Sequence, residues 1–286
     1  MLISLHSKAI LFFLFAWFNF SLMEVTAKYL SLFYPALEVV WMRFISQSIV
    51  LTLLFLPSLR IKLETNALHL HILRAICLYL AATFFFIGFT KIGFADATAI
   101  YNLSPLLLTV GGIIILREKM KKVKIASVVI GVLGAIIIIN PTSQSFSVFA
   151  FFPALAALCL AIFGLITRFF GENEDPFTSL IYTASVGSFL ASFALFWVWT
   201  PISLNHLAFI LLLGILSTLG HFLLIKAFQL EEASNLATFS SVTIIFNTIW
   251  GVLLFSEIPT LNFFLGSFLI VVGCILIVKQ NTYTHT

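Results

Sequence analysis

The sequence contains very little charge. Of its 286 residues, only 9% are Asp, Glu, Lys or Arg, whereas about 25% is typical of soluble domains. So few charged side chains cannot cover the surface of a protein of this length, which argues against a soluble globular protein and indicates that most of the surface faces lipid. What the sequence has instead is apolar residues, which make up 61% of the chain. This hydrophobicity excludes an intrinsically disordered protein.

Cysteine is also scarce. Cys77, Cys159 and Cys274 each stand alone within an apolar run, without the spacing of metal ligands. Three isolated cysteines exclude a disulfide-rich scaffold, and we expect them to be packing residues. The sequence therefore predicts no bound metal and no cofactor.

The patterns of a catalytic or ATP-driven protein are missing as well. His69 and His71 form the only close histidine pair, and no nucleophile stands with a base in a recognisable arrangement. No glycine-rich loop for phosphate binding is present, which argues against a primary pump. The sequence also lacks the repeated charged rings or the filter of a channel. These absences argue against an integral membrane enzyme and against a channel.

Ten apolar segments are long enough to cross a bilayer as helices. A hydrocarbon core of about 30 Å needs roughly 20 apolar residues, and charged residues, Pro, Asn and Gly interrupt the chain at suitable intervals. We therefore predict an all-α integral membrane protein with ten transmembrane helices and no extramembrane domain. The predicted spans are 9–29, 37–57, 73–91, 97–116, 124–140, 148–168, 177–199, 206–227, 235–255 and 262–278.

The distribution of basic residues predicts the orientation. If the N-terminus is cytoplasmic, 12 of the 15 Lys and Arg residues fall in cytoplasmic loops or helix ends, and only Lys28, Arg43 and Lys91 lie toward the outer side. This bias follows the positive-inside rule, so we predict a multi-pass protein of a bacterial-type inner (plasma) membrane with both termini in the cytoplasm. The net charge of +4 then reflects contact with lipid headgroups, and no nucleic-acid partner is expected.

The two halves of the sequence resemble each other. With a constant offset of 139 residues and no gap, residues 89–139 align with residues 228–278. The polar and glycine matches are Thr109 with Thr248, Gly112 with Gly251, Glu118 with Glu257 and Gly134 with Gly273. We therefore predict two five-helix repeats, at residues 1–142 and 143–286. Because five is odd, the second repeat is inverted in the membrane, an architecture typical of transporters that bind solute near the midplane and work by alternating access.

Local sequence patterns add a resemblance to a known family. They are a Glu that ends spans 4 and 9, a Gly-rich fifth span in each half, and the motifs Ala27-Lys28-Tyr29-Leu30, Glu38-Val39-Val40-Trp41-Met42-Arg43-Phe44 and Ser104-Pro105-Leu106. In this order and spacing they resemble the EamA family of the drug/metabolite transporter superfamily, over nearly the whole chain. Ile244 departs from the pattern, because it stands where a proline would match Pro105. The resemblance implies a transporter of small organic solutes such as amino acids, riboflavin or S-adenosylmethionine.

Span 1 presents candidate solute-binding residues on one helical stripe. Trp17, Ser21, Glu24 and Lys28 follow one another at i, i+4, i+7 and i+11. A carboxylate within the membrane is costly unless it meets a partner or water, so Glu24 is the first functional candidate. It either binds an amine-bearing solute or a coupling proton, or it forms a structural ion pair with Arg43 in span 2. Both interpretations stay open from the sequence.

Four charged residues are predicted to have structural or coupling roles. Arg43 has no charged counterpart in the second half, which favours a structural role. Lys28 is expected to pair with Glu38 across the first connection, at little gain in stability. Glu118 and Glu257 sit at helix ends beside the next turn, where capping or hairpin stabilisation is favoured over transport chemistry.

Spans 4 and 9 carry polar stripes that correspond under the repeat. The residues on these stripes are Tyr101 and Ser104 in span 4 and Ser240, Thr243, Asn247 and Trp250 in span 9. Such groups either line a solute cavity or simply join neighbouring helices, and their clustering with two aromatic residues favours a cavity. His221 in span 8 is a further candidate, either as a proton relay or as a hydrogen-bonded packing residue.

The chemistry of these candidates suggests a class of solute. Glu24 and the aromatic pair Trp17 and Tyr101 fit an amine-bearing or sulfonium metabolite, so we expect an amino acid or an S-adenosylmethionine-like solute. Riboflavin is the alternative, on the aromatic residues alone. The expected partners are therefore a small-molecule solute and the lipid bilayer, and a homodimer is compatible with the sequence.

Overall fold

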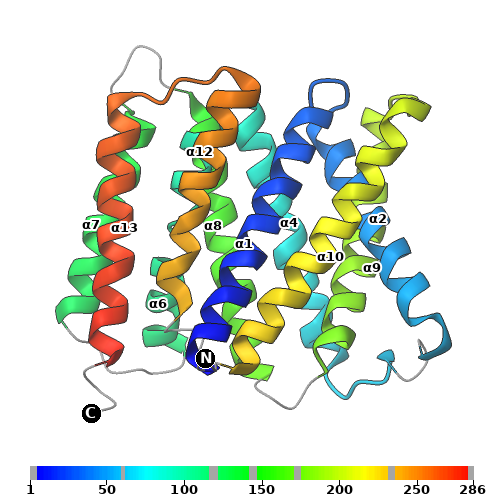
Figure 1. The fold of residues 1–286 in the computed structure, drawn as a ribbon, viewed down its shortest axis with the longest axis horizontal. Coiled ribbons are helices and arrows are strands. Elements are labelled where there is room, and N and C mark those ends of the chain that lie inside the picture. Colours follow the sequence, from blue (N-terminus) through cyan, green and yellow to red (C-terminus); the bar gives the residue numbers. More distant parts are fainter. Residues whose placement is uncertain are drawn as a thin grey trace.

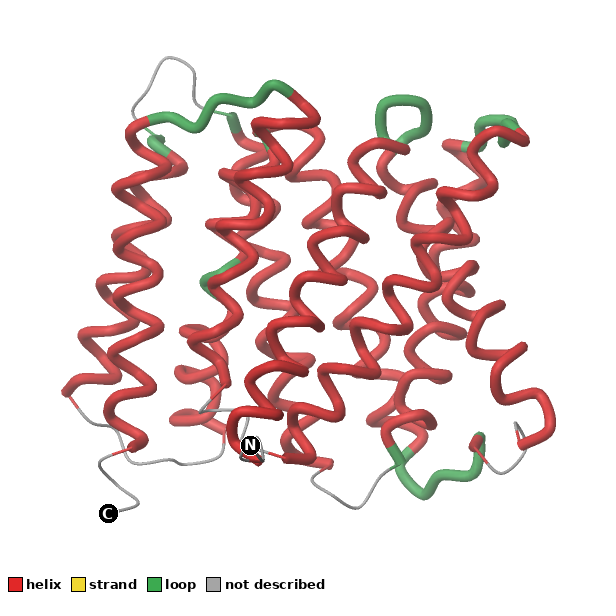
Figure 2. The backbone as a smooth tube through the Cα atoms, viewed as in Figure 1, coloured by secondary structure: helices red, strands yellow, loops and turns green. Residues whose placement is uncertain are grey.

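The fold of the described residues is entirely helical. The computed structural model describes residues 5–58, 62–115, 122–141, 147–170, 175–230 and 236–282, and every regular element in these ranges is a helix (Figure 1, Figure 2). The first half contains α1 (Leu5–Leu30), α2 (Ala36–Phe55), η1 (Leu56–Ser58), α4 (Leu68–Ile92), α5 (Phe94–Tyr101), α6 (Ser104–Ile115) and α7 (Lys122–Ile139). The second half contains η2 (Val148–Ala150), α8 (Phe151–Phe170), α9 (Pro176–Val198), η4 (Leu204–His206), α10 (Leu207–Leu230), η5 (Ala237–Ser241), α12 (Val242–Phe255) and α13 (Leu261–Thr282).

These elements form ten membrane spans within the described ranges. The helices α1, α2, α4, α8, α9 and α10 are each long and apolar enough to cross a bilayer unaided. The other four spans are the shorter helix α7, the helix α13, and two composite spans made of α5 with α6 and of η5 with α12. The prediction of an all-α membrane protein with ten transmembrane helices is confirmed.

Short polar segments start and stop the helices. The Asp175 carboxylate accepts a hydrogen bond from the Phe177 N–H at 3.0 Å, and Pro176 occupies the first position of α9, where its missing N–H costs nothing. At the other end of the second half, Ser256 adopts a left-handed conformation with φ 55° and ends α12. These caps keep the connections short, so that consecutive helices run antiparallel.

Spans 4 and 9 are each composed of two helical segments. Span 4 is interrupted at Asn102 and Leu103, between α5 and α6. Pro105 explains this break, because proline lacks the N–H that would bond to the carbonyl of Tyr101 one turn earlier. Span 9 changes at the equivalent place from the 3₁₀ helix η5 to the α-helix α12, although Ile244 takes the position of the proline. Both repeats are therefore broken at the same level.

The two halves run in opposite directions. In Figure 1, α1 rises from the N-terminus whereas its counterpart α8 descends, and both termini lie at the lower face. The predicted inversion of the second five-helix repeat is therefore confirmed. An even number of spans explains why the two termini share one face.

The halves interlock, because the main contacts join one to the other. The helix α1 packs on α10, and the equivalent pair is α4 on α8. Equivalent spans also meet each other: α2 meets α9, α7 meets α13, and spans 4 and 9 meet through α5 and α12. This pattern is that of a pseudo-two-fold axis between the repeats.

Glycines make the contact between α7 and α13 close. A Cβ atom on Gly134 would lie 2.5 Å from the Gly266 carbonyl oxygen, and a Cβ atom on Gly273 would lie 2.7 Å from the Ser127 carbonyl oxygen. The offset of 139 residues converts one of these contacts exactly into the other. The glycine-rich fifth spans thus bring two backbones together at the edge of the molecule (Figure 1).

Candidate functional site

Asn247 of α12 is the centre of a buried hydrogen-bond network. Its amide nitrogen donates to the Glu24 carboxylate at 2.6 Å and to the Thr98 hydroxyl at 2.8 Å. Its amide oxygen accepts a hydrogen bond from the Ser21 hydroxyl at 2.5 Å. The predicted polar stripes of span 1 and span 9 therefore face each other, and α5 contributes a third side through Thr98.

The helix break in span 4 adds a second layer to this network. The Asn102 amide donates to the Thr243 hydroxyl at 3.2 Å and to the Thr98 carbonyl oxygen at 2.9 Å. Thr243 donates in turn to the Ser240 carbonyl oxygen at 2.8 Å. We call Ser21, Glu24, Thr98, Asn102, Thr243 and Asn247 the central polar cluster.

Sequence reasoning missed Thr98 as a member of this cluster. Thr98 and Asn102 are spaced i and i+4 in α5, so they lie on the same face of that helix. That polar pair just before Ser104 and Pro105 was a signal that the sequence contained. Asn102 is a weaker candidate from the sequence, and Thr98 is no candidate at all, because the repeat pairs the stripe of span 9 with Tyr101 and Ser104.

Glu24 and Arg43 are both buried, with exposed fractions of 6% and 5%. Within the described residues these two do not form an ion pair, because no nitrogen of Arg43 lies within 4.0 Å of a carboxylate oxygen of Glu24. Their opposite charges interact only at longer range. The structural ion pair is therefore not formed here, and the hydrogen-bond partner of Glu24 is Asn247.

Lys28 pairs with Glu257, not with Glu38 as the sequence suggested. The second oxygen of Glu257 accepts a hydrogen bond from the Phe94 N–H at 2.7 Å, so this carboxylate caps α5 across the interface between the halves. Glu38 instead accepts from the Thr200 N–H at 3.0 Å. The expected pairing was wrong because Lys28 lies on the stripe that faces α12.

The ion pair of Lys28 and Glu257 lies at the face opposite the termini, one helical turn beyond Glu24. The Lys28 ammonium also lies 5.2 Å from the ring centre of Phe94 and 4.9 Å from that of Phe255. Glu118, the counterpart of Glu257, lies outside the described residues.

Aromatic residues surround the cluster without making hydrogen bonds to it. Trp17 packs edge-on between Phe13 and Phe20, and Tyr101 stacks on Phe85 with ring centres 4.6 Å apart. Trp250 is half-buried against the main core. Ser104 and Ser240 are buried in the broken spans 4 and 9.

His221 is placed as a packing residue. Its Nδ1 atom lies 2.8 Å from the Ser217 carbonyl oxygen, one turn earlier in α10. Its ring meets that of Phe20 edge to face, with centres 4.8 Å apart. The contacts of His221 are therefore with its own helix and with an apolar ring of α1, not with the central polar cluster.

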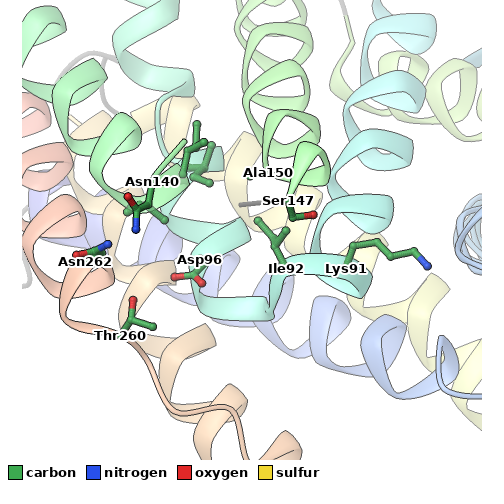
Figure 3. Close-up of a pocket in the computed structure, with 11 residues that line it drawn as sticks. Lys91, Ile92, Asp96, Asn140, Ser147, Ala150, Thr260 and Asn262 are labelled. Carbon is green, nitrogen blue, oxygen red and sulfur yellow. The ribbon is translucent and has the colours of Figure 1, made fainter. Parts of the chain in front are cut away.

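A cavity of about 300 Å³ lies on the other face of α5 (Figure 3). Asp96, Asn140, Thr260 and Asn262 surround one end of it, whereas Lys91 extends away from Asp96 to the ring of Phe149. Asp96 is two residues from Thr98, which places the two side chains on nearly opposite faces of the helix. This cavity is therefore separate from the cluster. Among the described residues, no group of three or more His, Cys, Asp and Glu is arranged to hold a metal.

Known proteins share this architecture. A solved crystal structure superposes with a TM-score of 0.69 over 96% of this chain and 98% of that chain, at 16% identity, which shows the same fold. The chain is 28% identical to the pseudopaline exporter of Pseudomonas aeruginosa, with 98% of this chain and 99% of the exporter covered. It is 26% identical to the S-adenosylmethionine uptake transporter of Rickettsia bellii, with 93% of each chain covered.

A more distant relative is the riboflavin transporter of Brucella anthropi, which is 23% identical over 85% of this chain and 88% of the relative. The profile of the EamA-like transporter family matches the chain twice, at residues 7–140 and 148–279. These two matches cover nearly the whole sequence, and the helices described above have the composition of membrane spans. The chain therefore belongs to the EamA-like transporter family and is a multi-pass membrane transporter.

Proposed function

We propose that this protein is a secondary transporter that carries a small organic metabolite across a bacterial-type inner membrane by alternating access. The observation that supports this most is the central polar cluster, in which both repeats contribute side chains at the level where both are broken. Inverted repeats with broken helices place their binding sites at such a level. In this proposal, the repeats occupy residues 1–142 and 143–286, and both termini are cytoplasmic.

The charge of the cluster favours a solute with an amine or a sulfonium group. Glu24 is buried, and its described hydrogen-bond partner is a neutral amide, so a cationic group would complete its interactions. An amino acid or an S-adenosylmethionine-like solute has such a group. The relative from Rickettsia bellii is named for S-adenosylmethionine uptake, which supports this class.

The ion pair of Lys28 and Glu257 supplies one gate of the proposed cycle. It joins α1 to the segment after α12, on the side of the cluster away from the termini. Access from that face requires these elements to separate. The Phe94 N–H, which Glu257 also binds, couples this separation to the start of α5.

Riboflavin is a second candidate because of two indole groups. The Nε1 atoms of Trp17 and Trp250 are buried and have no hydrogen-bond partner among the described residues. An aromatic solute with several carbonyl oxygens would stack on the rings nearby and accept these hydrogen bonds. The relative from Brucella anthropi is named as a riboflavin transporter.

Counterflow in proteoliposomes tests the proposal. Purified protein would be reconstituted with an unlabelled solute inside and the labelled solute outside, using S-adenosylmethionine, L-lysine, L-methionine and riboflavin in turn. We expect transient accumulation of the labelled S-adenosylmethionine or amino acid, and none in protein-free liposomes. Accumulation of riboflavin alone would replace the first candidate by the second. Silence with all four solutes would contradict the proposed solute classes.

The same liposomes test energy coupling. An imposed proton gradient, inside or outside acidic, should change net uptake if a proton moves with the solute through Glu24. Net uptake that does not respond to either gradient would exclude obligatory proton coupling.

A further inference from the structure

Two arginines are buried within the helix bundle, and their surroundings differ. Arg74 of α4 donates from Nη2 to the Ser179 carbonyl oxygen at 3.1 Å and to the Thr183 hydroxyl at 3.2 Å. Its guanidinium also lies 4.9 Å from the ring centre of Phe163. Arg74 therefore bonds to α9 in the manner of a residue that fixes two helices together.

Arg43 of α2 has no such partners. Its Nε atom is fully buried without an acceptor, as is that of Arg74, but among the described residues Arg43 makes no hydrogen bond or ion pair through its other nitrogens either. Its described contact is with the ring of the adjacent Phe44, at 4.9 Å. One helical turn further along α2, the Gln47 side-chain oxygen is likewise buried without a donor. Arg43 is 5% exposed as a whole residue, and a guanidinium with five donors in such a buried position needs acceptors from some source.

The neighbouring charge shows what kind of group is missing. Glu24 of α1 lies within electrostatic range of Arg43 but does not touch it, and Tyr101 lies within range of both. Glu24 already accepts a hydrogen bond from Asn247, whereas the guanidinium has no anion beside it among the described residues. The two residues are thus a separated pair of opposite charges with distinct surroundings.

Building on the proposed function, we propose that Arg43 binds the carboxylate of a zwitterionic solute whose amine is held by Glu24. A guanidinium binds a carboxylate through two parallel hydrogen bonds, which would satisfy the buried donors of Arg43. The ammonium of the same solute neutralises Glu24. The solute then supplies each residue with a partner of opposite charge, which explains why Glu24 and Arg43 do not pair directly. This assigns a substrate-binding role to Arg43, which the sequence favoured as structural.

Matched pairs of solutes test the inference, because they differ only in the carboxylate. They are S-adenosylmethionine with its decarboxylated form, and L-lysine with cadaverine. Each is used as a competitor of counterflow of the labelled carboxylate-bearing member. For the wild-type protein we expect loss of the carboxylate to weaken competition about 10- to 100-fold, the range of a charged hydrogen bond.

Three variants assign this discrimination to a residue. In Arg43→Gln, the two members of a pair should compete almost equally, because affinity for the carboxylate-bearing member falls while that for the amine is kept. Arg43→Lys should keep part of the discrimination, since it keeps the charge without the bidentate geometry. Arg74→Gln is the matched control, which we expect to lower the yield of folded protein and to leave the discrimination at its wild-type value.

The outcomes separate this inference from the proposed function. Transport by the wild-type protein without discrimination within a pair would overturn the role of Arg43 alone, as would full discrimination by Arg43→Gln. If Arg43→Gln does not fold, Arg43→Lys decides, because unchanged discrimination in that variant contradicts a bidentate contact. Silence toward both pairs overturns the proposed solute class together with this inference.

Discussion

α1 meets α12 through polar side chains, whereas α7 meets α13 through glycines. In the first contact Ser21 and Glu24 bond to Asn247, and every bond has a length of 2.5–2.6 Å. In the second contact the closest approaches are between backbone atoms, around Gly134 and Gly266. Both contacts join the two repeats, and both involve residues deep within the spans.

The two contacts differ in whether they can open without loss of stability. Hydroxyl, amide and carboxylate groups find equivalent partners in water or in a solute, so the α1 and α12 contact can open without leaving polar atoms unsatisfied. Two helices that touch through glycine backbones gain only from close packing, and any separation loses that gain. We therefore propose that the contact between α1 and α12 opens to bind solute and that the contact between α7 and α13 stays closed.

The largest expected effect is on the contact between α7 and α13. Gly134→Leu should abolish the accumulation of folded protein, because its Cβ alone would lie 2.5 Å from a backbone oxygen of α13 and overpacking costs about 1–3 kcal/mol, occasionally more. The monodisperse fraction in size-exclusion chromatography measures this loss. Gly251→Ala is the control, because the nearest atom to its Cβ would be 3.6 Å away. Equal behaviour of Gly134→Ala and Gly251→Ala would remove the distinction between the contacts.

The next effect is on binding without loss of folding. Glu24→Gln keeps an oxygen that accepts from Asn247 and removes the charge, so we expect near-normal amounts of folded protein and a 10- to 100-fold loss of transport, roughly the range of a charged hydrogen bond. Counterflow in proteoliposomes measures it. Glu38→Gln, the same change at a buried site that bonds to Thr200, should transport within about twofold of wild type. Normal transport by Glu24→Gln would show that the polar contact only holds helices together.

Two substitutions separate the contribution of the ion pair between Lys28 and Glu257 from that of the cap on α5. Glu257→Ala removes both the ion pair and the cap on the Phe94 N–H and leaves the buried Lys28 ammonium without an anion, so we expect the larger loss of stability. Lys28→Met removes the ion pair alone and leaves Glu257, which is partly exposed, bonded to the Phe94 N–H, so it should cost less. Thermal unfolding in detergent ranks the two variants. Equal losses would mean that capping α5 contributes nothing.

The smallest expected effect is at Thr98. Thr98→Val preserves the shape of the side chain and removes one of the acceptors of Asn247, at a cost of about 1 kcal/mol, which corresponds to roughly fivefold in affinity. Thr98→Ser keeps the hydroxyl and should behave as wild type. The KM of transport distinguishes them. If both variants are indistinguishable from wild type, α5 forms no part of the binding surface.

Most of the fold was predictable because the membrane imposes a simple rule. A span must be apolar and about 20 residues long, so the apolar runs alone locate all ten spans. The breaks in spans 4 and 9 were not predicted, although Pro105 marked the first one. The second break has no proline, since Ile244 stands there, and no local sequence pattern marks the change from η5 to α12.

The candidate site was predictable where it follows helical periodicity. The stripe of Ser21 and Glu24 could be identified from their spacing, and so could that of Thr243 and Asn247. Which stripes face each other depends on tertiary contacts, for example the 229 residues that separate Lys28 from Glu257. For that reason Lys28 was assigned to Glu38, its neighbour along the chain.

The matching glycine contacts between α7 and α13 show that the two repeats are structurally equivalent, and this symmetry has a thermodynamic consequence. If the two repeats were identical in sequence, exchanging their conformations would convert the inward-facing carrier into an outward-facing one of equal free energy. Residues with no like counterpart lift this degeneracy. Glu24 and Arg43 have no charged residue at the equivalent positions of the second repeat. They are therefore among the residues that make the inward-facing and outward-facing states of the empty carrier unequal in free energy.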